Sequence, residues 1–125
     1  MSIPKILIAE DEEGLRELYR LRFELESFNV IFAKNGEEAL KKIKKEKPDL
    51  VLLDIMMPKK SGIDVLKELR KDPTNKKIPV VILSVLSEEH FKTKAKKLGA
   101  NAYLVKADVM ASDVVSKVKE ILGSQ

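Results

Sequence analysis

Five short runs of apolar residues recur along the chain, and each is followed by a longer, more polar stretch. Within a run the apolar residues are continuous and do not alternate with polar ones. Strands that are buried on both faces have this pattern, which is typical of a parallel sheet covered by helices. The runs predict strands at residues 6–9, 30–33, 50–53, 80–83 and 102–105.

Between the runs, apolar residues recur three or four positions apart, which is the spacing of one helix face. We expect each of these stripes to face the core. Strict alternation of strand and helix requires crossover connections, with helices on both faces of the sheet. The predicted fold class is therefore α/β: a doubly wound five-stranded parallel sheet with five helices, for which the common strand order is 2-1-3-4-5. The stripes are Leu15, Leu18, Leu21 and Leu25; Ala39, Leu40 and Ile43; Val65, Leu66 and Leu69; Phe91, Ala95 and Leu98; and Val114, Val115, Val118, Ile121 and Leu122.

The composition narrows the class of protein. A chain of 125 residues with 44% hydrophobic residues suits one globular domain spanning residues 1–125. The absence of cysteine excludes disulfides, thiolate zinc sites and thiol catalysis. We find no signal peptide and no apolar run near the ~18 residues of a membrane helix, so we expect a soluble cytoplasmic protein.

The net charge of +4 comes from 24 basic and 20 acidic residues, mostly Lys interleaved with Glu on the predicted helices. This arrangement indicates a solvated helical exterior. Nucleic-acid binding is not favoured, because no arginine-rich or aromatic-interleaved patch is present.

Polar residues follow the apolar runs where the predicted strands end. Glu10 and Asp11 follow the first strand, Asp54 the third, Ser84 the fourth and Lys106 the fifth. In a sheet of order 2-1-3-4-5, strands 1 and 3 are neighbours ~4.8 Å apart, so the three acids would crowd one crevice. Carboxylates at close range must take up protons or share a cation. Oxygen ligands with room for water favour Mg²⁺.

Each of these residues also has a plainer interpretation. Glu10 and Asp11 could complement the dipole of the following helix, and Ser84 could cap the next one. Lys106 could be a surface lysine. A carboxylate such as Asp54 at the end of an apolar strand, however, is costly without a partner. Two acids, a hydroxyl and a lysine at four strand ends together favour one functional site.

At these positions the chain resembles the receiver domains of bacterial response regulators in two-component signalling, including the chemotaxis regulators. The strongest part is residues 54–58, Asp-Ile-Met-Met-Pro, followed by Gly62. Glu10 and Asp11 match the family's acidic pair. The other matches are the hydroxyl residue Ser84, the lysine Lys106 and the aromatic switch residue Tyr103. The resemblance covers nearly the whole chain and implies a flavodoxin-like fold.

The resemblance also implies a mechanism. Asp54 would accept a phosphoryl group from a sensor histidine kinase or a phosphotransfer protein in a Mg²⁺-dependent reaction. Ser84 and Lys106 would hold the phosphoryl oxygens, and Tyr103 would follow Ser84 as the surface of helix 4, strand 5 and helix 5 changes to bind a downstream protein. Such a protein catalyses only its own phosphorylation and dephosphorylation. The implied metal ligands are Glu10, Asp11, Asp54 and the main-chain carbonyl of Met56.

Several features set this chain apart from the family pattern or leave alternatives open. Ala107 stands where receivers have proline, so we expect a trans bond after Lys106, and Val85 replaces a small residue. The apolar side chains of Met56 and Leu86 flank the expected water path and predict a long-lived phosphorylated state. Since the chain ends just past the last helix, we expect a relay or protein-binding switch.

Three rival functions remain to be weighed. A flavin mononucleotide carrier would need a first loop that attracts phosphate, whereas the acids that follow the first strand repel it. A phosphatase with an aspartyl phosphate intermediate would need a second acid where Met56 stands. A degenerate receiver that acts only as a protein-interaction module is the main alternative.

Overall fold

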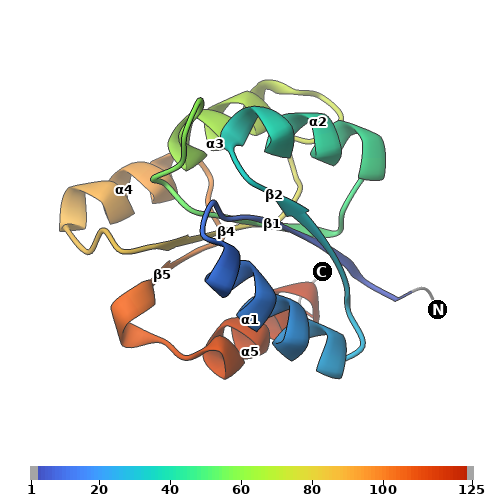
Figure 1. Ribbon diagram of the computed structural model, residues 1–125. Coiled ribbons are helices and arrows are strands. Elements are labelled where there is room, and N and C mark those ends of the chain that lie inside the picture. The colour runs from blue at the N-terminus through green and yellow to red at the C-terminus, as the bar shows by residue number, and fades with distance from the viewer. Residues whose placement is uncertain (1–2, 124–125) are drawn as a thin grey trace.

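The computed structural model describes residues 3–123, which form a five-stranded parallel sheet with helices on both faces (Figure 1). The strand order is β2-β1-β3-β4-β5, which confirms the predicted order and the flavodoxin-like α/β fold. The strands are β1 (Lys5–Ala9), β2 (Asn29–Ala33), β3 (Leu50–Leu53), β4 (Val80–Ser84) and β5 (Ala102–Val105). The α-helices are α1 (Glu13–Leu25), α2 (Gly36–Glu46), α3 (Gly62–Lys71), α4 (Glu89–Lys97) and α5 (Ala111–Gly123), and a short 3₁₀ helix covers Lys106–Asp108.

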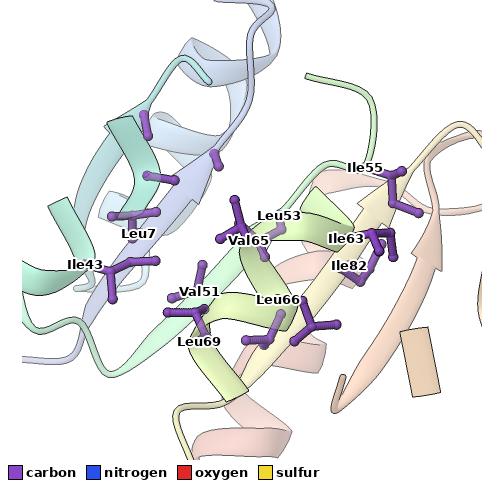
Figure 2. Close-up of a cluster of buried hydrophobic side chains, with 14 of the residues drawn as sticks. Leu7, Ile43, Val51, Leu53, Ile55, Ile63, Val65, Leu66, Leu69 and Ile82 are labelled. Atoms are coloured by element: carbon purple, nitrogen blue, oxygen red, sulfur yellow. The ribbon is translucent and has the colours of Figure 1, made fainter. Parts of the chain in front are cut away.

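The sheet separates two hydrophobic cores. Helices α2, α3 and α4 cover one face, where Val65, Leu66 and Leu69 of α3 pack over Val51 and Leu53 of β3 (Figure 2). Helices α1 and α5 cover the other face. Strands β1, β3 and β4 lie inside the sheet and are almost wholly apolar, because helices cover both of their faces.

Local sequence explains where two of the helices begin. The side chain of Asn35 accepts a hydrogen bond from the Glu38 amide at 2.8 Å, and Ser61 accepts one from the Asp64 amide at 3.2 Å. Both are N-caps, which satisfy amides that the first turn of a helix leaves unpaired. The second cap places the start of α3 directly after the loop that follows β3.

One predicted stripe is wrong at three of its four leucines, since only Leu15 packs against the core. In α1 the buried side chains are Tyr19 and Phe23, while Leu18, Leu21 and Leu25 are 44%, 60% and 73% exposed. Both sets of residues have helical spacing, and the structure turns the aromatic pair inward, where Phe23 meets Phe28 edge-on with ring centres 5.5 Å apart. A row of leucines on α1 therefore faces solvent.

Candidate phosphoryl-acceptor site

The parallel register brings the predicted site residues to one edge of the sheet. Ala9 pairs with Leu53, and the amide of Asp54 donates to the Ala9 carbonyl at 3.2 Å. Glu10 and Asp54, which follow these two strands, are consequently side by side and buried, with 2% and 6% of their surface exposed. The edge formed by the carboxyl ends of the strands is where ligands of open α/β sheets bind.

Lys106 contacts both buried acids. Its ammonium nitrogen donates to Glu10 Oε1 at 2.6 Å and to Asp54 Oδ2 at 2.8 Å. The bond between Lys106 and Ala107 is trans, as expected, because none of the peptide bonds in residues 3–123 is cis. Lys106 therefore reaches the acids without the proline that receivers usually carry after this lysine.

Burial and ion pairing shift the pKa values of Glu10 and Lys106 in opposite directions. Burial raises the pKa of Glu10 above its usual range, although the hydrogen bond and charge of Lys106 act in the opposite direction. Burial also disfavours the charged form of Lys106, but the hydrogen bonds and charges of Asp54 and Glu10 outweigh it and raise the pKa of this lysine. One ammonium thus pairs with two buried carboxylates and offsets only part of the effect of burial on Glu10.

Three carboxylates could hold a metal ion. One oxygen each from Glu10, Asp11 and Asp54 lies within 4.8 Å of the others, and Asp11 is exposed to solvent. Within residues 3–123 the Met56 carbonyl accepts no hydrogen bond, while the Met56 amide donates to Asp54 Oδ1 at 3.1 Å. Acidic oxygens, a free carbonyl and access for water are the donor set that Mg²⁺ prefers. The residues therefore fit the predicted ion.

The plainer interpretations of the site residues are only partly supported. The N-cap of α1 is Glu12, which makes no side-chain cap, but Glu10 Oε2 accepts a hydrogen bond from the Glu12 amide at 3.1 Å. Ser84 ends β4 and is fully buried, so it does not cap α4, whose N-cap is Glu88. Lys106 is not a simple surface lysine, because only 14% of its side chain is exposed.

Ser84 and Tyr103 are joined through Leu86. The Leu86 amide donates to Ser84 Oγ at 3.2 Å, and the Tyr103 hydroxyl donates to the Leu86 carbonyl at 2.6 Å. Tyr103 is half-buried, and burial raises its pKa. The loop between β4 and α4 thus links the predicted hydroxyl and the predicted aromatic switch residue.

An apolar groove adjoins the site, and the sequence alone did not reveal it. It has a volume of about 720 Å³ and lies between α1 and the segment that joins β5 to α5, with Lys106 among its lining residues. The sequence of α1 carries two apolar stripes, and one is enough to pack against the core. The second stripe was the signal that could have predicted an apolar groove. Its apolar and aromatic lining consists of Leu15, Leu18, Tyr19, Val85, Ala107, Val109, Met110 and Ala111.

In residues 3–123, no helix combines the length and hydrophobicity that are needed to cross a membrane.

Known proteins are similar to this chain in sequence and in fold. The family model of the response regulator receiver domain matches residues 6–119. The alkaline phosphatase synthesis transcriptional regulatory protein PhoP of Bacillus subtilis is 42% identical over 118 residues, which are 94% of this chain and 48% of that protein. The CpxR transcriptional regulatory protein of Escherichia coli is 40% identical over 118 residues, 94% of this chain and 49% of that protein. The chain spans about half the length of these curated relatives.

Solved structures agree with these sequence relatives. A CheY-like response regulator receiver domain protein from Methanospirillum hungatei superposes with a TM-score of 0.91 at 27% identity, covering 98% of this chain and 96% of that one. The BeF3-activated N-terminal receiver domain of Klebsiella pneumoniae RstA gives 0.87 at 29% identity, covering 94% and 97%. With the family model matched across residues 6–119 and the acidic pocket and lysine in place, the chain belongs to the response regulator receiver domain family and is a signalling protein.

Proposed function

We propose that this domain, taken as one unit over residues 1–125, is a phosphorylation-dependent switch whose phosphoacceptor is Asp54. The observation that carries the proposal is the contact between the Lys106 ammonium and the Asp54 carboxylate inside a pocket with two further acids. A buried carboxylate with a fixed cation beside it can become a nucleophile, because the cation neutralises charge that gathers on a transferring phosphoryl group.

The reaction exchanges one bond to phosphorus for another. An oxygen of Asp54 forms a bond to phosphorus while the phosphorus–nitrogen bond of a phosphohistidine breaks, and the histidine nitrogen keeps the electron pair. Mg²⁺ held by Glu10, Asp11, Asp54 and the Met56 carbonyl would neutralise charge on the phosphoryl group. The domain in this account catalyses only its own phosphorylation and dephosphorylation.

Ser84 and Lys106 would bind the phosphoryl oxygens. Ser84 Oγ accepts from the Leu86 amide and keeps its own proton to donate. Movement of Ser84 toward the phosphoryl group pulls on Leu86 and, through the Leu86 carbonyl, on Tyr103. A change beside Asp54 would thereby reach the surface formed by α4, β5 and α5, where a downstream protein would bind.

The apolar groove is the docking surface that we assign to the phosphoryl donor. A donor must bring its phosphohistidine to Asp54, and the groove reaches Lys106, the lysine that contacts this aspartate. Leu18 and Met110, at 44% and 73% exposure, offer the groove's partner an apolar contact. A helix of a sensor histidine kinase or phosphotransfer protein suits such a groove. We place this reaction in the cytoplasm, where ATP, the source of the kinase's phosphoryl group, is found.

Phosphotransfer from purified kinases of the source organism tests this proposal. We expect transfer to the wild type with Mg²⁺, and none to Asp54→Asn or after chelation of Mg²⁺. Leu18→Ser should slow transfer from the kinase about tenfold, because removing one central apolar contact costs ~1–2 kcal/mol, and it should leave phosphorylation by acetyl phosphate unchanged. Ile3→Ser, at a site 55% exposed and outside the groove, is the control.

A receiver that only binds partners is the alternative function. It predicts no phosphoryl transfer from any kinase or from acetyl phosphate, with partner binding that Asp54→Asn leaves unchanged. The paired lysine and the three clustered carboxylates favour the phosphorylated switch, because a pure binding surface does not require a buried charge cluster.

A further inference from the structure

The loop between β3 and α3, which includes Met56, is tightly folded. The Gly62 amide donates to the Ile55 carbonyl at 3.0 Å, and the Lys60 amide donates to the Pro58 carbonyl at 2.8 Å. Lys59 takes a left-handed conformation with φ of 69°. The loop therefore has little freedom to adjust when one of its ends is moved.

The two ends of this loop, Asp54 and Lys60, each lie against a glycine. A Cβ atom on Gly62 would lie 2.1 Å from the Asp54 carbonyl oxygen, and a Cβ atom on Gly36 would lie 2.1 Å from the Lys60 carbonyl oxygen. Gly62 belongs to the motif that follows Asp54. Gly36, by contrast, is the first residue of α2, which lies beside α3 on the same face of the sheet (Figure 1).

Gly36 is required because it lacks a Cβ atom, which leaves room for the Lys60 carbonyl group. Its φ does not lie in the left-handed region, so another residue could adopt the same backbone conformation. The atoms that a side chain would meet are the Lys60 carbonyl carbon and oxygen and Lys60 Cβ, none of which is the flexible end of a side chain. Helix α2 cannot easily retreat, because the Asn35 cap fixes its start and Ala39 and Ile43 are buried in the core.

The far side of Lys60 is also anchored. Its ammonium pairs with Glu68 on α3, so the end of the loop is held between α2 and α3. We infer that Gly36 is a positioning residue: by allowing α2 to press directly on Lys60, it sets the loop that carries the Met56 carbonyl, the main-chain metal ligand of the proposed function. This inference rests on the proposed function, in which Mg²⁺ binds at that carbonyl and the carboxylates.

Gly36→Ala tests the inference. The Lys60 carbonyl oxygen would have to move by about 1.3 Å, from 2.1 Å to the 3.4 Å at which ordinary contact with a new Cβ atom begins. Since a misplacement of ~1 Å can cost ~100-fold in a catalytic site, and the loop absorbs part of the movement, we expect Mg²⁺ affinity to fall about five-fold. The Mg²⁺ concentration for half-maximal phosphorylation by acetyl phosphate should rise equally, while the rate at saturating Mg²⁺ changes little.

Gly14→Ala is the matched control. Gly14 also lies in the first turn of a helix near the site, but a Cβ atom there would meet nothing within 4 Å. We expect its Mg²⁺ affinity to equal that of the wild type. If Gly36→Ala lowers thermal stability but binds Mg²⁺ as the wild type does, Gly36 only packs the fold and the inference is overturned.

A second variant covers the case in which Gly36→Ala does not fold. Lys60→Gly removes the Lys60 Cβ atom, which lies 2.7 Å from the place that a Cβ atom on Gly36 would occupy, and lets the loop adapt. Gly36→Ala combined with Lys60→Gly should fold, but it should still bind Mg²⁺ more weakly than Lys60→Gly alone, because the Lys60 carbonyl must still move away from the new Cβ atom. Equal Mg²⁺ affinities of these two variants would contradict the inference. A wild type that binds no Mg²⁺ at all would contradict the proposed function itself, which keeps the two failures distinguishable.

Discussion

Lys106 is the residue on which the charge balance of the site depends. Glu10 and Asp54 are nearly inaccessible to water, and the contacts at 2.6 and 2.8 Å supply the compensating charge. Removing one member of a buried charge cluster leaves the others unpaired, which costs more than the ion pair contributed. The same lysine occupies oxygens that a metal ion would share.

Lys106→Met should therefore destabilise the metal-free protein by about 3 kcal/mol at neutral pH, measured by urea unfolding in a chelator. Mg²⁺ should recover part of this loss and should bind the variant more tightly than the wild type, because the ion no longer competes with the Lys106 ammonium for the acids. Lys119→Met, which removes an exposed pair with Glu26, should leave the unfolding midpoint close to that of the wild type. Equal unfolding midpoints for the two variants would refute this charge balance.

Asp11 and Glu10 should differ as metal ligands. Asp11 is exposed and makes no hydrogen bond or ion pair with Lys106, whereas Glu10 already bonds Lys106 and the Glu12 amide. We expect Asp11→Ala to weaken Mg²⁺ binding more than Glu10→Ala does, because a direct ligand matters more than one acting through water. Titration calorimetry of both variants measures the order, and the reverse order would exchange the two roles.

Met56 bears on the lifetime of the phosphorylated state. Its side chain is 56% exposed beside Asp54, and it cannot orient a water by a strong hydrogen bond. Leu86 packs partly against the core, so substitution of Met56 alone is the cleaner experiment. Met56→Asn should shorten the half-life of the phosphorylated protein about tenfold with Mg²⁺ present, since water positioning contributes ~1–3 kcal/mol to such barriers. An unchanged half-life after removal of the phosphodonor would show that Met56 does not set the lifetime.

At the scale of elements, α1 shows where hydrophobic periodicity stops being informative. The strands were predicted to within one residue at each end, because each is a continuous apolar run. In α1, by contrast, the leucine stripe and the stripe of Leu15, Tyr19 and Phe23 have equally good helical spacing. Periodicity gives the existence of a helix, but the choice between two apolar faces depends on which fits the sheet. Of the leucines on the unused face, Leu18 lines the groove that we assign to the phosphoryl donor.

The inward aromatic pair and the outward leucines of α1 predict different costs for two substitutions in this helix. Phe23→Ala should destabilise the protein by about 3–5 kcal/mol, because it opens a cavity beside Phe28. Leu25→Ser should change stability by no more than ~0.5 kcal/mol, because the side chain is 73% exposed. Urea unfolding of both variants checks the pair. A large loss of stability for Leu25→Ser would show that the leucine face of α1 is buried after all.

At the scale of the whole molecule, the site depends on the order of the strands. Glu10, Asp54, Ser84 and Lys106 are far apart in sequence, and order 2-1-3-4-5 brings their strand ends together. That gathering could be predicted, because continuous apolar runs define the strands and polar residues mark their ends. The contact of Lys106 with Glu10 could not, because it depends on backbone geometry after β5. Neither could the fit of Gly36 against Lys60, which joins segments that share no sequence pattern.

The most direct measurement identifies the residue that carries the phosphoryl group. The wild type is phosphorylated with acetyl phosphate and Mg²⁺ and then reduced with borohydride, which converts an aspartyl phosphate to homoserine, and its peptides are sequenced by mass spectrometry. We predict homoserine at position 54 alone, and none in Asp54→Asn or in the absence of Mg²⁺. Homoserine at position 11, or none in the wild type, would contradict the assignment of Asp54 as the phosphoacceptor.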